Sequence, residues 1–185
     1  MSDKIFKDAQ GHMEKALEAF QREVSKMRTG RASLNLLDDI RVEYYGQYLP
    51  LNQVATLGVP EPRMIMVTPC ESNIIPAIEK AIEKANIGLN PVNDGKAIRL
   101  PIPTLTEERR RDFVKMLKSH GEESRVAIRQ SRREALDVAK KLEKEGKMTE
   151  DDSKKLSTQI QKLTDDFVAK IDAVVANKEK EILQV

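Results

Sequence analysis

The stretch Leu100–Glu107 (LPIPTLTE) marks the point where a proline-containing segment gives way to a long, charged segment without proline. All 8 prolines of the 185-residue chain lie between Pro50 and Pro103. Because proline breaks helix interiors and favours turns and strand ends, the chain is predicted to run helix, turn-rich insert, helix. Thr104 and Glu107 have the spacing of a capping box, so we expect the second long helix to begin near residues 104–107.

Apolar residues recur at steps of three and four on both sides of the insert, which is the period of an amphipathic helix. The first stripe stops at Thr29-Gly30 and consists of Ile5, Ala9, Met13, Ala16, Leu17, Phe20, Val24 and Met27. The second stops at Gly146 and consists of Phe113, Leu117, His120, Ser124, Ala127, Ile128, Ser131, Ala135, Val138 and Leu142. The third follows a predicted helix start at Thr149 and consists of Leu156, Ile160, Leu163, Phe167, Ile171, Val174 and Ile182.

These stripes predict three long helices packed as an antiparallel three-helix bundle. A coiled coil between chains is the alternative. The short connection over residues 145–148 favours an antiparallel pair within one chain, because it returns the third helix alongside the second.

The insert has the patterns of a small α+β (β/α/β) domain. Residues 40–45 alternate between apolar and polar side chains, and Val54–Val59 and Met64–Val67 are short apolar runs, so we expect strands there. Ser72–Ala85 carries one apolar helix face, and Asn90–Leu100 is predicted to fold as a hairpin at an Asp-Gly pair.

The predicted fold class is therefore α+β, with two domains of which one is discontinuous. We expect the bundle to comprise residues 1–30 and 105–185, and the inserted domain to comprise residues 31–104. Two linkers join them, and a double linker is predicted to act as a hinge. Its residues are Thr29, Gly30, Arg31, Ala32 and Ser33 in one linker and Pro101, Ile102, Pro103, Thr104 and Leu105 in the other.

The composition argues against several functional classes. No apolar run approaches the roughly 18 residues of a membrane-spanning helix, and the N-terminus does not resemble a signal peptide. The chain has 1 cysteine and 2 histidines, and it contains neither GxGxxG nor a P-loop. We therefore expect a cytoplasmic protein that is not an enzyme and has no metal or cofactor. His120 is interpreted as a packing residue, and Cys70 as structural or incidental.

Positive charge is concentrated on the second predicted helix. Residues 106–144 hold 12 basic and 8 acidic residues, whereas residues 32–105 hold 6 and 8. Arginines follow helical spacing on one face of this helix, and Arg28 and Arg31 extend its edge; the face consists of Arg125, Arg129, Arg132 and Arg133. Because guanidinium groups grip phosphate bidentately, this face predicts binding to a structured RNA. No module that reads DNA sequence is present, so no DNA partner is expected.

A less specific interpretation of the same face stays open. Charged helix faces are often only solvated, with pairs such as Glu122 and Lys118 at i,i+4 spacing. In the insert, Tyr44 and Tyr45 are candidates for stacking on RNA bases, although strand alternation places one of them toward the core.

Several long segments of the chain resemble the ribosome recycling factor family. They are Lys26–Ser33, Leu36–Asp38, Val42–Gly46, Leu89–Pro91, Ile98–Arg110 and Arg125–Arg133. The similarity extends over essentially the whole chain in one register. It implies an elongated, L-shaped molecule in which a three-helix bundle forms the long arm and a small α+β domain forms the short arm.

The resemblance also implies a function and a set of contacts. Together with elongation factor G and GTP, such a factor splits the post-termination ribosome into subunits and itself hydrolyses nothing. The expected partners are large-subunit ribosomal RNA and elongation factor G, with no membrane, and we expect a monomer. The implied RNA contacts are Arg28, Arg31, Arg110, Arg129, Arg132 and Arg133. The competing hypothesis is a coiled-coil adaptor or chaperone that binds protein partners; an enzyme is third.

Overall fold

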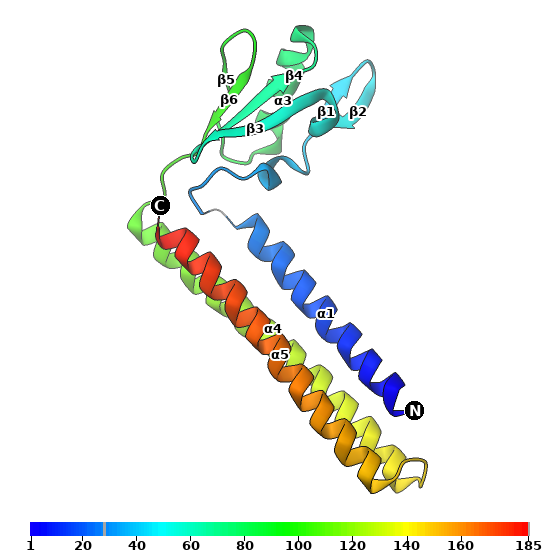
Figure 1. The fold of residues 1–185 in the computed structure, drawn as a ribbon. Helices are drawn as coiled ribbons and strands as arrows, with labels where there is room; N and C mark the ends of the chain where they lie inside the picture. Colours follow the sequence, from blue (N-terminus) through cyan, green and yellow to red (C-terminus); the bar gives the residue numbers. More distant parts are fainter. Residues whose placement is uncertain (28, 185) are drawn as a thin grey trace. The chain divides into compact units, whose positions relative to one another are not determined.

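The computed structural model describes residues 1–27 and 29–184, and these divide into two compact units (Figure 1). The helical unit comprises Met1–Met27 and Arg111–Gln184, and the mixed unit comprises residues 29–110. Each unit has hydrophobic clusters of its own, so each is stabilised by its own buried side chains.

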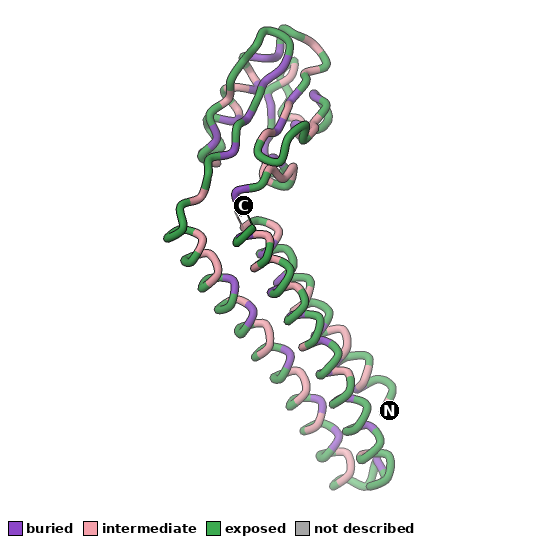
Figure 2. The backbone as a smooth tube through the Cα atoms, turned by 60° about the vertical axis from the view of Figure 1, so that its left-hand side comes forward, coloured by how far each residue is buried: buried purple, intermediate pink, exposed green. Residues whose placement is uncertain are grey.

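In the described part of the chain, the three long helices are α1 (Ser2–Lys26), α4 (Glu107–Lys144) and α5 (Glu150–Leu183). Buried positions recur along each of them (Figure 2), as an amphipathic pattern requires. Two clusters follow one another along the bundle, and both take residues from all three helices. The predicted helix bundle is confirmed.

The ends of α4 and α5 show how the sequence sets helix boundaries. Thr149 caps α5, because its Oγ1 accepts a hydrogen bond of 3.1 Å from the backbone N of Asp152. α4 begins at Glu107, within the predicted range of residues 104–107. The capping residue is Thr106 and not Thr104, because Thr106 Oγ1 accepts a 3.2 Å hydrogen bond from the backbone N of Arg109. Between the helices, Gly146 adopts a φ of +70°, a left-handed conformation that favours glycine, and follows the end of α4 in a tight turn.

The stripe predicted for α4 is partly displaced. Val138 is 47% exposed, whereas its neighbour Ala139 is buried. Ala139 belongs to a buried cluster with Ala9 of α1 and Ile160 of α5, so the buried stripe passes through residue 139 and not 138. On α5 the buried stripe likewise includes Thr164 and Val175 in place of the predicted Leu163 and Val174, which are half-buried.

The mixed unit contains a two-stranded and a four-stranded antiparallel sheet. The first pairs β1 (Arg41–Tyr44) with β2 (Gln47–Pro50). The second has the order β3 (Ala55–Glu61), β4 (Met64–Pro69), β6 (Ile98–Pro101) and β5 (Val92–Asn93). The helical segments are η1 (Leu34–Leu37), α2 (Leu51–Val54), η2 (Ser72–Ile74) and α3 (Ile75–Ala85).

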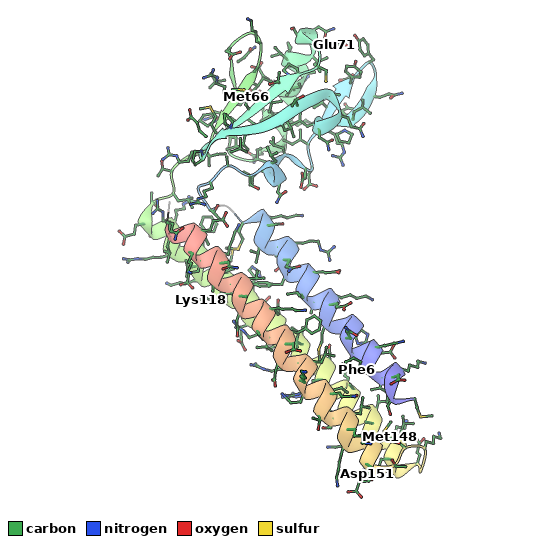
Figure 3. The ribbon with its side chains drawn as sticks, in the orientation of Figure 1. Phe6, Met66, Glu71, Lys118, Met148 and Asp151 are labelled. Carbon is green, nitrogen blue, oxygen red and sulfur yellow. The ribbon has the colours of Figure 1, made fainter. Side chains whose placement is uncertain are left out.

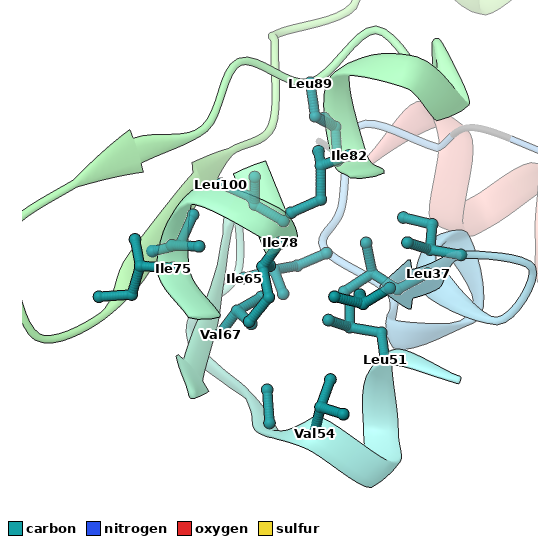
Figure 4. Packing of buried hydrophobic residues seen from close by; sticks show 14 of the residues in the cluster. Leu37, Leu51, Val54, Ile65, Val67, Ile75, Ile78, Ile82, Leu89 and Leu100 are labelled. Carbon is teal, nitrogen blue, oxygen red and sulfur yellow. The ribbon is translucent and has the colours of Figure 1, made fainter. Parts of the chain in front are cut away.

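The core of the mixed unit lies between α3 and the larger sheet (Figure 4). Ile78 of α3 and Ile65, Val67 and Leu100 of the sheet all have exposed fractions of 0%. The predicted strands, hairpin and helix are present. The prediction missed β2 and the single turns η1 and α2, which are too short for periodicity to reveal.

Both linkers are fixed to the mixed unit at adjacent residues of the β3–β4 turn. The backbone N of Ala32 donates to the carbonyl of Pro62, and that of Ile102 donates to the carbonyl of Arg63, each at 2.8 Å. Two residues before Ala32 in the first linker, Gly30 has a φ of +80°. Ala32 and Ile102 are thus held by backbone hydrogen bonds within the mixed unit.

Candidate nucleic-acid interface

The arginines predicted to share one face lie in the middle of α4. Arg125, Arg129, Arg132 and Arg133 are all within continuous helix, so their spacing places them on one side. Their environments differ strongly. These differences decide which side chains are available to an external ligand.

Arg125 is committed to contacts within the helical unit. Its Nη2 and Nε lie 2.7 Å and 2.8 Å from Asp172 Oδ1 on α5, and its Nη1 lies 3.0 Å from Glu122 Oε2. Burial by itself lowers the pKa of this guanidinium, but hydrogen bonds to Asp172 and Glu122 outweigh it and raise the pKa above its usual value. With only 19% of its side chain exposed, Arg125 fastens α4 to α5.

The other three arginines are more available. Arg129 has 45% of its side chain exposed and one acidic contact, at 3.3 Å to Glu122. Arg132 donates from Nη1 to Gln161 Oε1 at 3.2 Å. Arg133 is exposed and makes no side-chain hydrogen bond or ion pair within residues 1–27 and 29–184. This stretch of α4 therefore offers a set of largely uncommitted guanidinium groups.

The remaining predicted contacts lie elsewhere in the chain. Arg28 is outside the described residues. Arg31 is exposed and belongs to the mixed unit. Arg110 lies in the first turn of α4, and its Nε is buried with no hydrogen-bond partner in the part of the chain that the structure describes.

The ion pair expected between Glu122 and Lys118 is absent from the described residues. Glu122 pairs with Arg125 and Arg129 instead, while Lys118 Nζ lies 3.3 Å from Glu179 Oε1 on α5. Figure 3 labels Lys118 on the helical unit. The acidic residues of α5 were not among the predicted site residues. The sequence does contain a signal that could have indicated them: these acids recur every seven residues, and cations on α4 recur with the same spacing.

Tyr44 and Tyr45 form a small cluster with Glu71 in the mixed unit. The two hydroxyls donate to the two carboxylate oxygens of Glu71, at 3.0 Å and 3.1 Å. The rings meet edge to face, with centroids 4.6 Å apart. The hydrogen bond to Glu71 raises the pKa of Tyr44 above 10.0. Tyr45 is 75% exposed and Tyr44 is half-buried, so one of the two tyrosines does turn toward the core, as strand alternation predicted.

Other candidates for chemistry are isolated. In residues 1–27 and 29–184, no cluster of His, Cys, Asp and Glu side chains is suited to hold a metal ion. His120 lies at the edge of the seam, with Nδ1 3.3 Å from Glu23 Oε2, and Cys70 is exposed. None of the described helices combines the length and apolar content that a membrane span requires.

Comparison with known proteins identifies the family. A family model described as "Ribosome recycling factor" matches residues 20–183. The chain belongs to the ribosome recycling factor family. Membership confirms the resemblance drawn from the sequence motifs.

Individual relatives match over their full length. The chain is 53% identical over 185 residues to the ribosome-recycling factor of Geobacter metallireducens, covering 100% of both proteins. A solution structure of the ribosome recycling factor aligns with a TM-score of 0.82 at 42% identity, over 100% of this chain and 98% of that one. This similarity supports the observed combination of a helix bundle with an α+β unit.

A further structure shows a relative in its working context. It contains models for the T. thermophilus ribosome recycling factor and the E. coli elongation factor G bound to the E. coli post-termination complex. The chain is 47% identical to the matched protein, with a TM-score of 0.67 and 99% of each chain covered.

Proposed function

We propose that this chain is a cytoplasmic, monomeric translation factor that splits post-termination ribosomes into subunits together with elongation factor G and GTP. Family membership over residues 20–183 supports this function, and the structure of a relative with elongation factor G on the post-termination complex supports the partners. We assign GTP hydrolysis to elongation factor G alone.

The exposed arginines on the middle of α4 carry the proposed contact with large-subunit ribosomal RNA. Arg129 and Arg133 project from a rigid helix of 38 residues, and Arg132 beside them is held only by a neutral glutamine. Guanidinium groups on a rigid rod suit the phosphates of a folded RNA, which are recognised by position and not by base sequence. Arg125 is the least available member because two carboxylates already hold it.

The proposed hinge lies in the two linkers and includes fewer residues than the sequence indicated. Ala32 and Ile102 are tied to the mixed unit by backbone hydrogen bonds. We therefore place the proposed hinge at residues 29–31 and 103–105. Bending there would allow one unit to stay bound to the ribosome while elongation factor G moves the other.

The RNA contact is tested by reversing one free charge. Arg133→Glu is expected to weaken binding to purified large subunits by about ten-fold at moderate salt and to reduce the salt dependence, because phosphate contacts release counterions. The matched control is Lys155→Glu, which makes the same charge change at an exposed position on α5. Equal effects of the two variants would mean that only net charge matters, and unchanged binding of Arg133→Glu would contradict the assignment.

Subunit splitting is tested by light scattering of post-termination ribosomes. We expect scattering to fall only when this protein, elongation factor G and GTP are all present. An absence of any fall with an active elongation factor would contradict the proposed function and favour a protein-binding adaptor.

A further inference from the structure

Three polar residues of α4 that face α5 are spaced by seven positions. They are Lys118, Arg125 and Arg132. Because seven residues are close to two helical turns, these cations form one column along the side of α4 nearest α5.

The facing side of α5 carries acidic residues with the same spacing, Asp165, Asp172 and Glu179. The first rung joins Lys118 to Glu179 at 3.3 Å, and the second joins Arg125 to Asp172 at 2.7 Å. In the third, Arg132 donates to Gln161 Oε1 at 3.2 Å, and Gln161 Nε2 donates to Asp165 Oδ1 at 2.9 Å. The antiparallel helices thus hold an acidic rail (Asp165, Asp172 and Glu179) against a column of cations.

A second column of cations lies farther from α5. Arg129 and Arg133 are on this outer side, where Glu122 is the nearest acid to Arg129 and Arg133 has no acidic partner within the described residues. The basic face is therefore divided. Carboxylates of α5 hold Lys118 and Arg125. Within the described residues, Arg129, Arg132 and Arg133 make no ion pair with α5.

Folding stability does not explain this arrangement well. Side chains of the first two rungs are exposed by 30% to 59%, apart from Arg125 at 19%. Ion pairs that open to water contribute little to stability, because solvent screens them and side-chain entropy opposes them. A carboxylate within 3.3 Å of a cation nevertheless competes directly with any phosphate that approaches the same group.

We propose that the acidic rail determines specificity: it occupies Lys118 and Arg125, repels arbitrary polyanions, and leaves Arg129, Arg132 and Arg133 for RNA phosphates. This inference rests on the proposed RNA contact of α4. At physiological salt, repulsion between charges extends over a Debye length of about 8–10 Å, which exceeds the roughly 5–6 Å between neighbouring positions on a helix surface. An RNA then gains full affinity only if its phosphates reach the arginines that the rail does not hold, Arg129, Arg132 and Arg133.

Isosteric neutralisation of the rail provides the test. Asp172→Asn and Glu179→Gln, singly and together, are compared with Asp166→Asn. Asp166 is an exposed α5 acid beside Asp3 and Phe6 of α1, on the side away from the rail. Binding of labelled poly(U) and of purified large subunits is measured across a salt series, with thermal melting of each full-length variant.

We expect the double variant to bind poly(U) about three- to ten-fold tighter than the wild type, with the log–log salt slope steeper by about 0.7 for each additional phosphate that the protein neutralises. Its affinity for large subunits changes less, so the ratio of specific to non-specific binding falls. If both rail variants bind poly(U) no tighter than Asp166→Asn does, the proposal is overturned. A lower melting temperature with unchanged poly(U) affinity overturns it equally, because the rail is then structural only.

The outcomes separate this inference from the proposed function. If wild type and variants all fail to bind large subunits, the ribosomal role is wrong. The poly(U) comparison still decides whether the rail limits access to the α4 arginines, since it does not depend on ribosomes.

Discussion

The helical and mixed units bury similar aliphatic side chains but are held together differently. Helices of the first unit satisfy their backbone hydrogen bonds locally over 25 to 38 residues, and side chains alone join one helix to the next. In the mixed unit, backbone pairing joins distant segments, as where Ile65 pairs with Leu100. The bundle therefore leaves whole helix faces free for organised charge, whereas the small sheets commit most of their short strands to pairing and core.

The strongest test of this comparison removes one core side chain from each unit. Ile128→Ala in the bundle and Ile65→Ala in the sheet each remove a side chain that is 0% exposed, so each is expected to lower the free energy of unfolding by about 2–5 kcal/mol. Because the clusters are separate, amide hydrogen exchange should speed up mainly within the altered unit. Equal loss of protection in both units would contradict their independence.

A second test concerns the close approach of α4 to α5. Gly121→Ala is expected to destabilise the protein by about 1–3 kcal/mol, because its Cβ would lie 2.9 Å from Val175 Cγ2. Gly11→Ala on α1 is the control: nothing lies within 4 Å of its Cβ, so higher helix propensity should stabilise by up to about 1 kcal/mol. Chemical denaturation measures both, and stabilisation by Gly121→Ala would show that the seam is loosely packed.

The smallest effect is expected at the tyrosine cluster of the mixed unit. Tyr44 donates to Glu71, which raises the pKa of the phenol above 10.0. The hydrogen bond between Tyr44 and Glu71 therefore stabilises the folded protein fully below about pH 10, and this stabilisation is lost as pH rises through the folded-state pKa of Tyr44. Glu71→Gln should lower the Tyr44 pKa, measured by NMR of labelled tyrosine, while Glu43→Gln on β1 should change it less. Identical titrations of the two variants would exclude Glu71 as the cause.

Much of the fold was predictable because the period of a long helix is visible in its sequence. The stripes through Phe20, Ile128 and Ile160 and the confinement of proline to residues 50–103 were sufficient for the three helices and the insert. Val138 was misassigned because periodicity cannot distinguish two neighbouring positions near the edge of a stripe. The burial of Ala139 depends on its packing against residues of α1 and α5, which is a tertiary property.

The candidate interface was predictable in composition but not in its division into two columns. Arginine spacing on α4 indicated the face. The commitment of Arg125 to Asp172 depends on the antiparallel register of α4 and α5, which the turn at Gly146 sets. Residues 118, 125 and 132 show their seven-residue spacing in the sequence, but their partners follow only once that register is known.

The packing of α1 against α5 has a consequence for the order in which the chain can fold during synthesis. α1 is translated first, and its main partner begins only at Glu150. Translation adds about 5–20 residues per second, so on the order of ten seconds pass between the synthesis of α1 and that of α5, which buries its apolar stripe. The mixed unit is continuous in sequence and can complete its core meanwhile. A nascent chain of this protein can therefore finish its insert before α5 completes the cluster that buries Met13 and Phe20.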